Sequence, residues 1–156
     1  MIGAAGFTLV ELVTTLIIIG ILSALTLPRM FDNQAFGQRG YIDEIAFALR
    51  YAQKIAVASE CPVEVTIGVA TYSALQRARD PVANTCDPAG VWNVPVLRAD
   101  GSPLNGTAPS NVLSAPATVV TFDATGALIG GAPPQLTVGA FTLNVTAATG
   151  MVTVLP

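Results

Sequence analysis

The side chains that could carry chemistry in this sequence are few, and they do not assemble into a catalytic set. The chain has 156 residues, with seven basic and ten acidic side chains and no histidine. Without histidine, a serine or cysteine nucleophile lacks its usual general base. Asp43 and Glu44 are adjacent in a predicted helix, where neighbouring side chains point in different directions. We therefore expect a protein that is not an enzyme and that uses no cofactor.

One carboxylate, Glu11, stands inside a long apolar run, and its position requires an explanation. Between Phe7 and Leu27 it is the only ionisable side chain. A helix of this length rises about 31 Å, enough to cross a hydrocarbon core of about 30 Å. A carboxylate at membrane depth costs at least about 2.5–3.5 kcal/mol. We expect Glu11 to meet a cationic partner inside a membrane or a helical bundle. The alternative is a signal-anchor helix that carries a glutamate by chance.

The residues around the apolar run do not fit an ordinary secretory signal. Such a signal has a basic start, a short apolar core and a small-residue cleavage site after that core. Here the small residues Gly3–Gly6 precede the run, so a cut after Gly6 would leave the apolar helix on the mature protein. Gly20 interrupts the run where alanine would be the better helix former. Pro28 follows the run and is expected to kink or end the helix.

The stretch GFTLVE, followed by an apolar helix, resembles the class III signal of type IV pilins and type II secretion pseudopilins. In that family a prepilin peptidase cuts after the glycine and N-methylates the new first residue. The resemblance implies cleavage between Gly6 and Phe7, with N-methylation of Phe7. It further implies that Glu11 is the family's buried assembly glutamate. Gly20 and Pro28 match the positions that loosen the family's helix.

The leader departs from the family's pattern in its charge. Leaders of this family usually carry Lys or Arg, and Met1–Gly6 carries neither. The first basic residues, Arg29 and Arg39, follow the apolar run on the side that should face outward. The positive-inside rule therefore does not by itself support the expected orientation. We expect the natural leader to be longer than Met1–Gly6.

Cys61 and Cys86 are the only cysteines in the chain. An even pair beyond an export signal is expected to form a disulfide in the periplasm. A metal site is not expected, because no histidine and no third cysteine could complete it. A free, buried pair of thiols is the alternative.

Helix signals dominate the first half of the chain and continue beyond Pro28. Residues 29–40 form a weak helical stretch, because Asn33, Gly37 and Gly40 lower helix propensity. The stretch Tyr41–Ser59 has a strong helical signal, with apolar residues at i, i+3, i+4 and i+7. That apolar stripe comprises Ile42, Ile45, Ala46, Leu49, Ala52 and Ala56.

Strand signals follow the helix. Apolar residues alternate between Val63 and Val69, and Tyr72–Arg77 is the expected hairpin partner. Residues 80–90 contain two Asp-Pro pairs and read as a loop. Residues 99–117 are rich in Gly, Pro, Ser and Asn, with one short strand possible near Val94–Leu97. The expected later strands are Thr118–Phe122, Ala127–Ile129, Leu136–Val138, Phe141–Val145 and Met151–Leu155.

These signals predict an α+β chain with four segments. The four segments are a leader (1–6), a transmembrane and assembly helix (7–27), the rest of the long N-terminal helix (28–60), and a β-rich periplasmic domain (61–156). The order resembles the H-type minor pseudopilins and the minor pilins of the mannose-sensitive haemagglutinin (MSHA) pilus. The resemblance implies a type IV pilin-like fold, in which the long helix packs on a C-terminal antiparallel β-sheet domain. The similar stretches are LPRMFD, RGYIDEIAFALRYAQKIAVASECPVEV, TFDATG and TLNVTAATGMVTV.

The resemblance implies an MSHA-type minor pilin that acts in pilus assembly, priming or tip placement. A type II secretion minor pseudopilin of H type is the alternative. Either protein would cross the bacterial inner membrane once, with its C-terminal domain in the periplasm, and would then enter a pilus or pseudopilus. The implied partners are other major and minor pilins or pseudopilins, prepilin peptidase, an assembly platform protein and inner-membrane lipid.

Two ligand classes are less favoured by the composition. A competence-type minor pilin that captures DNA would need clustered Lys or Arg, and none follows Arg98 in a chain of net charge −3. We therefore expect no nucleic-acid partner. Carboxylates in loops could bind calcium, but aspartate before Pro or Gly is equally explained by turn formation. These loop residues are Asp80, Asp87, Asp100 and Asp123.

Overall fold

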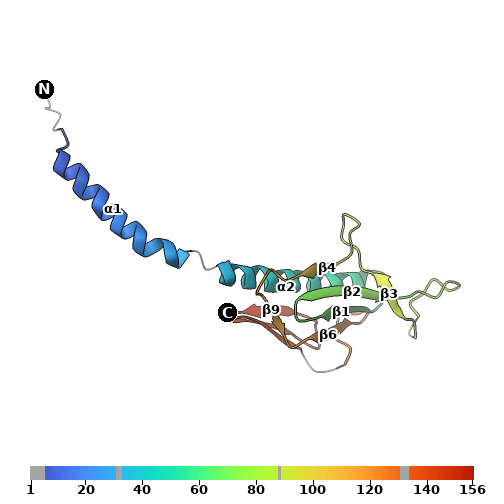
Figure 1. The fold of residues 1–156 in the computed structure, drawn as a ribbon. Coiled ribbons are helices and arrows are strands. Elements are labelled where there is room, and N and C mark those ends of the chain that lie inside the picture. Colours follow the sequence, from blue (N-terminus) through green and yellow to red (C-terminus); the bar gives the residue numbers. More distant parts are fainter. Residues whose placement is uncertain (1–5, 31–32, 88, 131–133) are drawn as a thin grey trace. The chain divides into compact units, whose positions relative to one another are not determined.

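The computed structural model describes residues 6–30, 33–87, 89–130 and 134–156. The chain divides into two compact units, Met1–Asn33 and Gln34–Pro156. The first unit contains helix α1, and the second contains nearly all of helix α2 together with the strands (Figure 1). Of the predicted leader, only Gly6 lies among the described residues.

Helix α1 spans Leu9–Met30, so it begins close to the predicted start at Phe7 and continues past Pro28. Helix α2 spans Asn33–Ser59, so the stretch predicted to be weak is helical on both sides of residues 31–32, which lie outside the described residues. Gly37 lies inside α2, and an added Cβ there would be 3.2 Å from Cγ2 of Val112. The glycine therefore permits a close approach between α2 and the loop before β5, which compensates for its low helix propensity.

The first sheet has five antiparallel strands in the order β3-β2-β1-β6, with β4 also paired to β2. The hairpin predicted after the helix is confirmed, because Val65 of β1 pairs with Ala74 of β2. The strand predicted at 118–122 is confirmed as β6, whose Val120 pairs with Val65. The strands are β1 (Val63–Ile67), β2 (Thr71–Arg77), β3 (Trp92–Pro95), β4 (Asn105–Thr107) and β6 (Thr118–Phe122).

The second sheet has four antiparallel strands in the order β5-β7-β8-β9. Its strands are β5 (Ser114–Ala115), β7 (Gln135–Val138), β8 (Phe141–Val145) and β9 (Val152–Leu155). The predicted antiparallel β-sheet domain is therefore confirmed, and its strands divide between two sheets. β4 and β5 lie in residues 99–117, where the Gly- and Pro-rich composition predicted no strand. The short strand predicted near Val94–Leu97 overlaps β3.

The strand predicted at Ala127–Ile129 is wrong, and its residues join the two sheets instead. The Ile129 N–H donates to the Thr121 carbonyl of β6 at 2.8 Å. The Leu128 N–H donates to the Ala147 carbonyl, between β8 and β9, at 2.9 Å. Because its bonds are divided between two partners, the segment makes only an isolated bridge, between Phe122 and Leu128.

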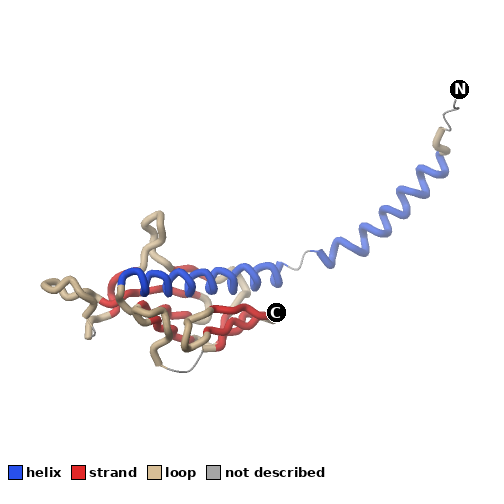
Figure 2. The backbone as a smooth tube through the Cα atoms, turned by 180° about the vertical axis from the view of Figure 1, so that it is seen from behind, coloured by secondary structure: helices blue, strands red, loops and turns tan. Residues whose placement is uncertain are grey.

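Helix α2 lies along the strands of the second unit, as two opposite views show (Figures 1 and 2). All six apolar residues of the predicted stripe are fully buried, so that prediction is confirmed. They form one hydrophobic cluster with residues from both sheets, including Val65, Phe122 and Leu143. Burial of this stripe therefore stabilises the packing of α2 on both sheets.

A side chain of α2 also connects the turns of the two sheets. Gln53 Nε2 donates to the Gly126 carbonyl at 2.8 Å and to the Thr149 carbonyl at 2.7 Å. Gly126 follows β6, and Thr149 precedes β9. Gly150 has φ +62°, and a Cβ there would clash with the Gly126 carbonyl and with Gln53. The two turns therefore pack too closely for any larger residue at Gly150.

Candidate functional site

The surface of α1 is the most unusual feature of the described chain. Every described side chain from Phe7 to Ile21 is exposed, including Phe7 at 72 % and Leu9 at 79 %. A helix that is apolar on all sides is normally buried in a membrane or among other helices. Among the described residues, no helix is both long enough and apolar enough to count as a membrane crossing.

The start of α1 is capped by a threonine that the sequence analysis did not single out. The Leu12 N–H donates to the Thr8 carbonyl at 3.1 Å, and the Glu11 N–H contacts Thr8 Oγ1 at 3.3 Å. Thr8 is therefore the N-cap, and Glu11 occupies the third helical position. The order Thr-x-x-Glu is that of a capping box, a signal that could have been read from the sequence. Glu11 thus has a local role at the positive end of the helix dipole, in addition to any intermolecular one.

The other residues predicted for assembly lie along α1 or just before it. Gly6 and Phe7 are exposed immediately before the helix. Gly20 lies inside the helix, and nothing is within 4 Å of the position that its Cβ would take. Pro28 lies within the bounds of α1, with its side chain outside the description. Among the described residues of the first unit, no neighbouring group requires glycine at position 20.

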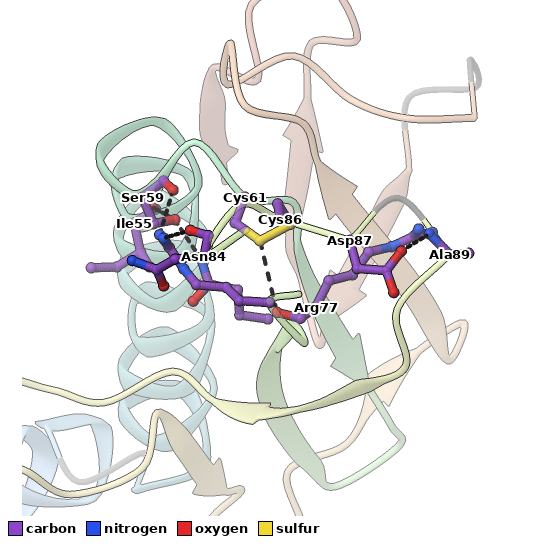
Figure 3. The surroundings of a disulfide bond; sticks show 10 residues. Ile55, Ser59, Cys61, Arg77, Asn84, Cys86, Asp87 and Ala89 are labelled. Carbon is purple, nitrogen blue, oxygen red and sulfur yellow. Dashed lines mark hydrogen bonds between the residues drawn. A yellow bond between two sulfur atoms is a disulfide. The ribbon is translucent and has the colours of Figure 1, made fainter. Parts of the chain in front are cut away.

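The disulfide between Cys61 and Cys86 is present, as predicted. The Cα atoms are 5.3 Å apart and the two residues are separated by 25 positions. Cys61 follows directly after the left-handed residue Glu60, which ends α2, and its N–H donates to the Ala56 carbonyl at 3.2 Å. Cys86 lies in the loop between β2 and β3. The bridge therefore fixes this loop to the C-terminal end of α2 (Figure 3).

Two side chains strengthen the same junction. Arg79 Nη2 donates to the Ser59 carbonyl at 2.8 Å, so a guanidinium caps the negative end of α2. The amide of Gln76 also bonds the Ser59 hydroxyl. Arg79 Nη1 reaches the Asn84 carbonyl at 3.0 Å, within the loop. The loop is thus held by the disulfide and by hydrogen bonds from the Arg79 guanidinium.

The loop aspartates use their oxygens within their own turns. Asp80 Oδ1 accepts from the N–H groups of Val82 and Ala83, which holds the pKa of the Asp80 carboxyl below its usual value. Asp87 accepts from the Ala89 N–H at 2.9 Å. Asp100 and Asp123 accept from the residues two positions onward. Nowhere in the described chain do three His, Cys, Asp or Glu side chains gather as metal ligands. Turn formation accounts for these carboxylates.

A hydrogen-bonded cluster joins α2 to the first sheet. The Tyr72 hydroxyl of β2 donates to Glu44 Oε1 of α2 at 2.7 Å. Arg98 Nη2 lies 3.2 Å from the Tyr72 hydroxyl and 2.7 Å from the Asn105 carbonyl of β4. Burial and the Glu44 hydrogen bond raise the pKa of Tyr72 to about 12. Gly106 of β4 lies directly against this cluster, where a Cβ would clash with the Tyr72 ring.

Most basic side chains have partners within the chain. Arg39 pairs with Asp43 at 2.9 Å, and the Arg77 guanidinium lies over the Trp92 ring at 4.7 Å. Arg50, Arg79 and Arg98 donate to main-chain carbonyls. These guanidinium groups are therefore held by groups of their own chain, and the absence of a nucleic-acid partner stays a prediction from the composition.

Comparison with known proteins identifies the family. The family model described as type II transport protein GspH matches residues 42–155. The chain belongs to the GspH family. That match covers the second unit and leaves Gly6, Phe7 and Glu11 outside it. Proteins of the GspH family are pilin-like structural proteins, so the prediction that the chain is not an enzyme is confirmed.

Two individual proteins are similar to this GspH-family chain. The type IV narrow pilus major component PilA5 of Thermus thermophilus is 43 % identical over 53 residues, which is 34 % of this chain and 46 % of PilA5. The chain thus spans less than half the length of that relative. The crystal structure of the type IV minor pilin FimU of Pseudomonas aeruginosa PAO1 matches with a TM-score of 0.51 and 15 % identity. That match covers 76 % of this chain and 92 % of FimU, and it confirms the pilin-like α+β fold.

Proposed function

We propose that the chain is a minor, H-type pseudopilin of a type II secretion system. The observation that supports this most strongly is the GspH family match over residues 42–155, behind a helix whose apolar side chains are exposed on all sides. In this proposal α1 anchors the subunit once in the bacterial inner membrane, with the second unit in the periplasm. On assembly, α1 leaves the lipid and packs among the helices of neighbouring subunits in the pseudopilus.

In this proposal, prepilin peptidase cuts between Gly6 and Phe7 and methylates the new amino group of Phe7. Both residues are exposed and precede the N-cap Thr8, so the site is accessible and outside the helix. The partners are then other pseudopilins, the assembly platform protein and inner-membrane lipid. We expect neither a metal ion nor a cofactor to take part.

A type IV minor pilin is the second candidate function. Two observations favour it: the fold matches the minor pilin FimU, and part of the chain is similar to the pilus component PilA5. The sequence resemblance to minor pilins of the MSHA pilus, and among them to MSHA biogenesis protein C, supports this second candidate. Deletion of the gene separates the two. A pseudopilin mutant loses exoprotein secretion and keeps its surface pili, whereas a pilin mutant loses pili and keeps secretion.

Processing is tested by intact-mass measurement of the membrane-extracted protein. We expect loss of Met1–Gly6 and gain of one methyl group in cells with active prepilin peptidase. Gly6→Val should block the cut, while the matched control Gly3→Val in the leader should leave it unchanged. Retention of Met1–Gly6 in the wild-type chain would contradict the proposal.

The role of Glu11 can be separated from its place in the capping box. Glu11→Gln keeps a side chain suited to the third helical position, but removes the charge that would pair with a neighbour's Phe7 amine. Thr8→Val removes the cap and keeps the charge, at a cost of about 1 kcal/mol to the helix. We expect E11Q to lose filament incorporation and T8V to retain most of it. If both variants assemble like the wild type, Glu11 has no intermolecular role.

A further inference from the structure

The two sheets of the second unit have five outer strands, β3, β4, β6, β5 and β9, and four of them are protected against pairing with another chain. β3 contains Pro95, and proline on an edge strand discourages further pairing. β4 and β5 have only three and two residues, and very short edge strands discourage further pairing. β6 is covered in part by the segment after it, where Ile129 bonds to Thr121. The fifth outer strand, β9, has none of these devices.

The residues of β9 are typical of a strand that pairs readily. Its sequence is Val-Thr-Val-Leu, with high β-propensity and no charge. In fact, no charged side chain occurs anywhere in residues 124–156. Charged residues are a common protection of exposed edges, so their absence here leaves β9 open. Leu155 of the strand and Met151 just before it are both more than half exposed.

The direction of the backbone groups in β9 follows from two hydrogen bonds. The Thr146 N–H donates to the Met151 carbonyl. The backbone N–H and C=O groups of Met151, and of every second residue after it, therefore point toward β8. The backbone N–H and C=O groups of Val152 and Val154 therefore point away from β8, toward the open edge. Consistent with this, the Val152 carbonyl accepts from Arg50 Nη2 of α2 at 3.0 Å. Within the described residues, the outward N–H and C=O of Val154 have no partner.

We propose that β9 is a docking edge for an extended strand of another protein chain that carries a carboxylate near Arg50. One residue of an extended strand can pair with both the N–H and the C=O of Val154, as in β-augmentation of a free sheet edge. Arg50 is exposed and has further N–H donors beyond the one on Val152, so it favours an acidic residue at that end of the incoming strand. A second copy of β9 brings no carboxylate, since the strand is uncharged.

This proposal deepens the proposed function, because a neighbouring subunit is the natural source of such a strand. The test uses the full chain in detergent micelles and requires neither a filament nor a secretion system. Its failure is therefore distinct from failure of the proposed function. The probes are three capped peptides: TVTVE, its lysine counterpart TVTVK, and TVPVE, in which a proline interrupts the strand.

The measurement is amide hydrogen exchange resolved at single residues. In the free chain, Val154 should exchange faster than Thr153 and Leu155, which face β8 and serve as internal controls. Saturating TVTVE should slow exchange at Val154 by about tenfold and leave Thr153 little changed. TVPVE should have no effect, and TVTVK should bind more weakly than TVTVE. In Arg50→Gln the two uninterrupted peptides should bind equally.

Val154→Pro provides a matched protein variant, because it removes an outward N–H and no bond within the sheet. It should keep the disulfide and the wild-type circular dichroism while losing the peptide effect. If V154P does not fold, the comparison of TVTVE with TVPVE on the wild-type chain still decides the matter. Equal protection by all three peptides, or none by any, would overturn the proposal. A self-associated chain with Val154 already protected would overturn it too, because the edge would then belong to a second copy.

Discussion

The two units of the chain place their apolar side chains in opposite environments. In α2 the stripe from Ile42 to Ala56 is fully buried against the sheets, whereas in α1 Leu16 and Ile17 are more than half exposed. The difference follows from sequence pattern, because α2 alternates apolar and polar faces and α1 is apolar all round. The second unit builds its core from its own residues. In the first unit the same kind of surface is exposed, and we propose that lipid or other chains bury it.

The largest expected effect is the loss of core packing in α2. Leu49 is fully buried, so Leu49→Ala should lower the free energy of unfolding by about 2–5 kcal/mol. Leu16→Ala in α1 removes the same atoms from an exposed position and should leave unfolding of the second unit unchanged. Fluorescence of Trp92, the only tryptophan, reports unfolding of the second unit in urea. Equal effects of the two substitutions would break the contrast between the units.

Removal of the disulfide should have the next largest effect. The paired variant Cys61→Ser with Cys86→Ser releases a loop of 25 positions, which the chain-entropy model values at roughly 3 kcal/mol. The loop should then become sensitive to limited proteolysis between Arg79 and Gly90. Thiol labelling of the unfolded, unreduced wild-type protein should find no free cysteine. Two labelled thiols would show that the bridge does not form in the cell.

The Tyr72 cluster should give the second unit a dependence on alkaline pH. The pKa of Tyr72 is raised from 10.0 to about 12, so the unfolded chain loses this proton first. The contribution of the neutral Tyr72 phenol to the free energy of unfolding is therefore full below pH 10. It decreases as the pH rises from 10 toward 12. Burial also raises the pKa of Tyr41, which contributes in the same direction.

Tyr72→Phe should cost about 1–3 kcal/mol at neutral pH, because Glu44 loses its hydrogen-bond donor and Arg98 keeps only the Asn105 carbonyl. It should also flatten the alkaline fall in stability, as measured by urea titrations at several pH values. Tyr51→Phe is the matched control, since its hydroxyl bonds only the Leu97 carbonyl among the described groups. An unchanged pH profile in Y72F would mean that the cluster does not control this titration.

The smallest expected effect on the isolated chain is that of Gly20→Ala. Nothing lies within 4 Å of the added methyl group, and alanine favours a helix over glycine by about 1 kcal/mol. Circular dichroism in detergent should show equal or slightly greater helicity. If filament incorporation falls nevertheless, Gly20 acts through flexibility or through contact with a neighbour. Gly40→Ala in α2, which is also unobstructed, is the control.

Local sequence was sufficient for the helices and for most strands. The period of apolar residues at Tyr41–Ser59 and the alternation after Cys61 each determine one element from near neighbours. The Thr8–Glu11 capping box was equally readable but was missed, because Glu11 was interpreted only through its charge. The short strands β4 and β5 were not readable, since they have two or three residues and form only where β2 and β7 lie beside them.

By itself the sequence determined the order of the elements, the apolar character of α1, the pairing of the only two cysteines and the absence of a catalytic set. Only the tertiary structure decided that the strands divide into two sheets and that residues 127–129 join them. It also brought Tyr72, Glu44 and Arg98 into one cluster and left β9 as an open edge. The physical reason is distance along the chain. Periodicity and capping act over a few residues, whereas strand partners and buried polar contacts depend on which distant segments the core brings together.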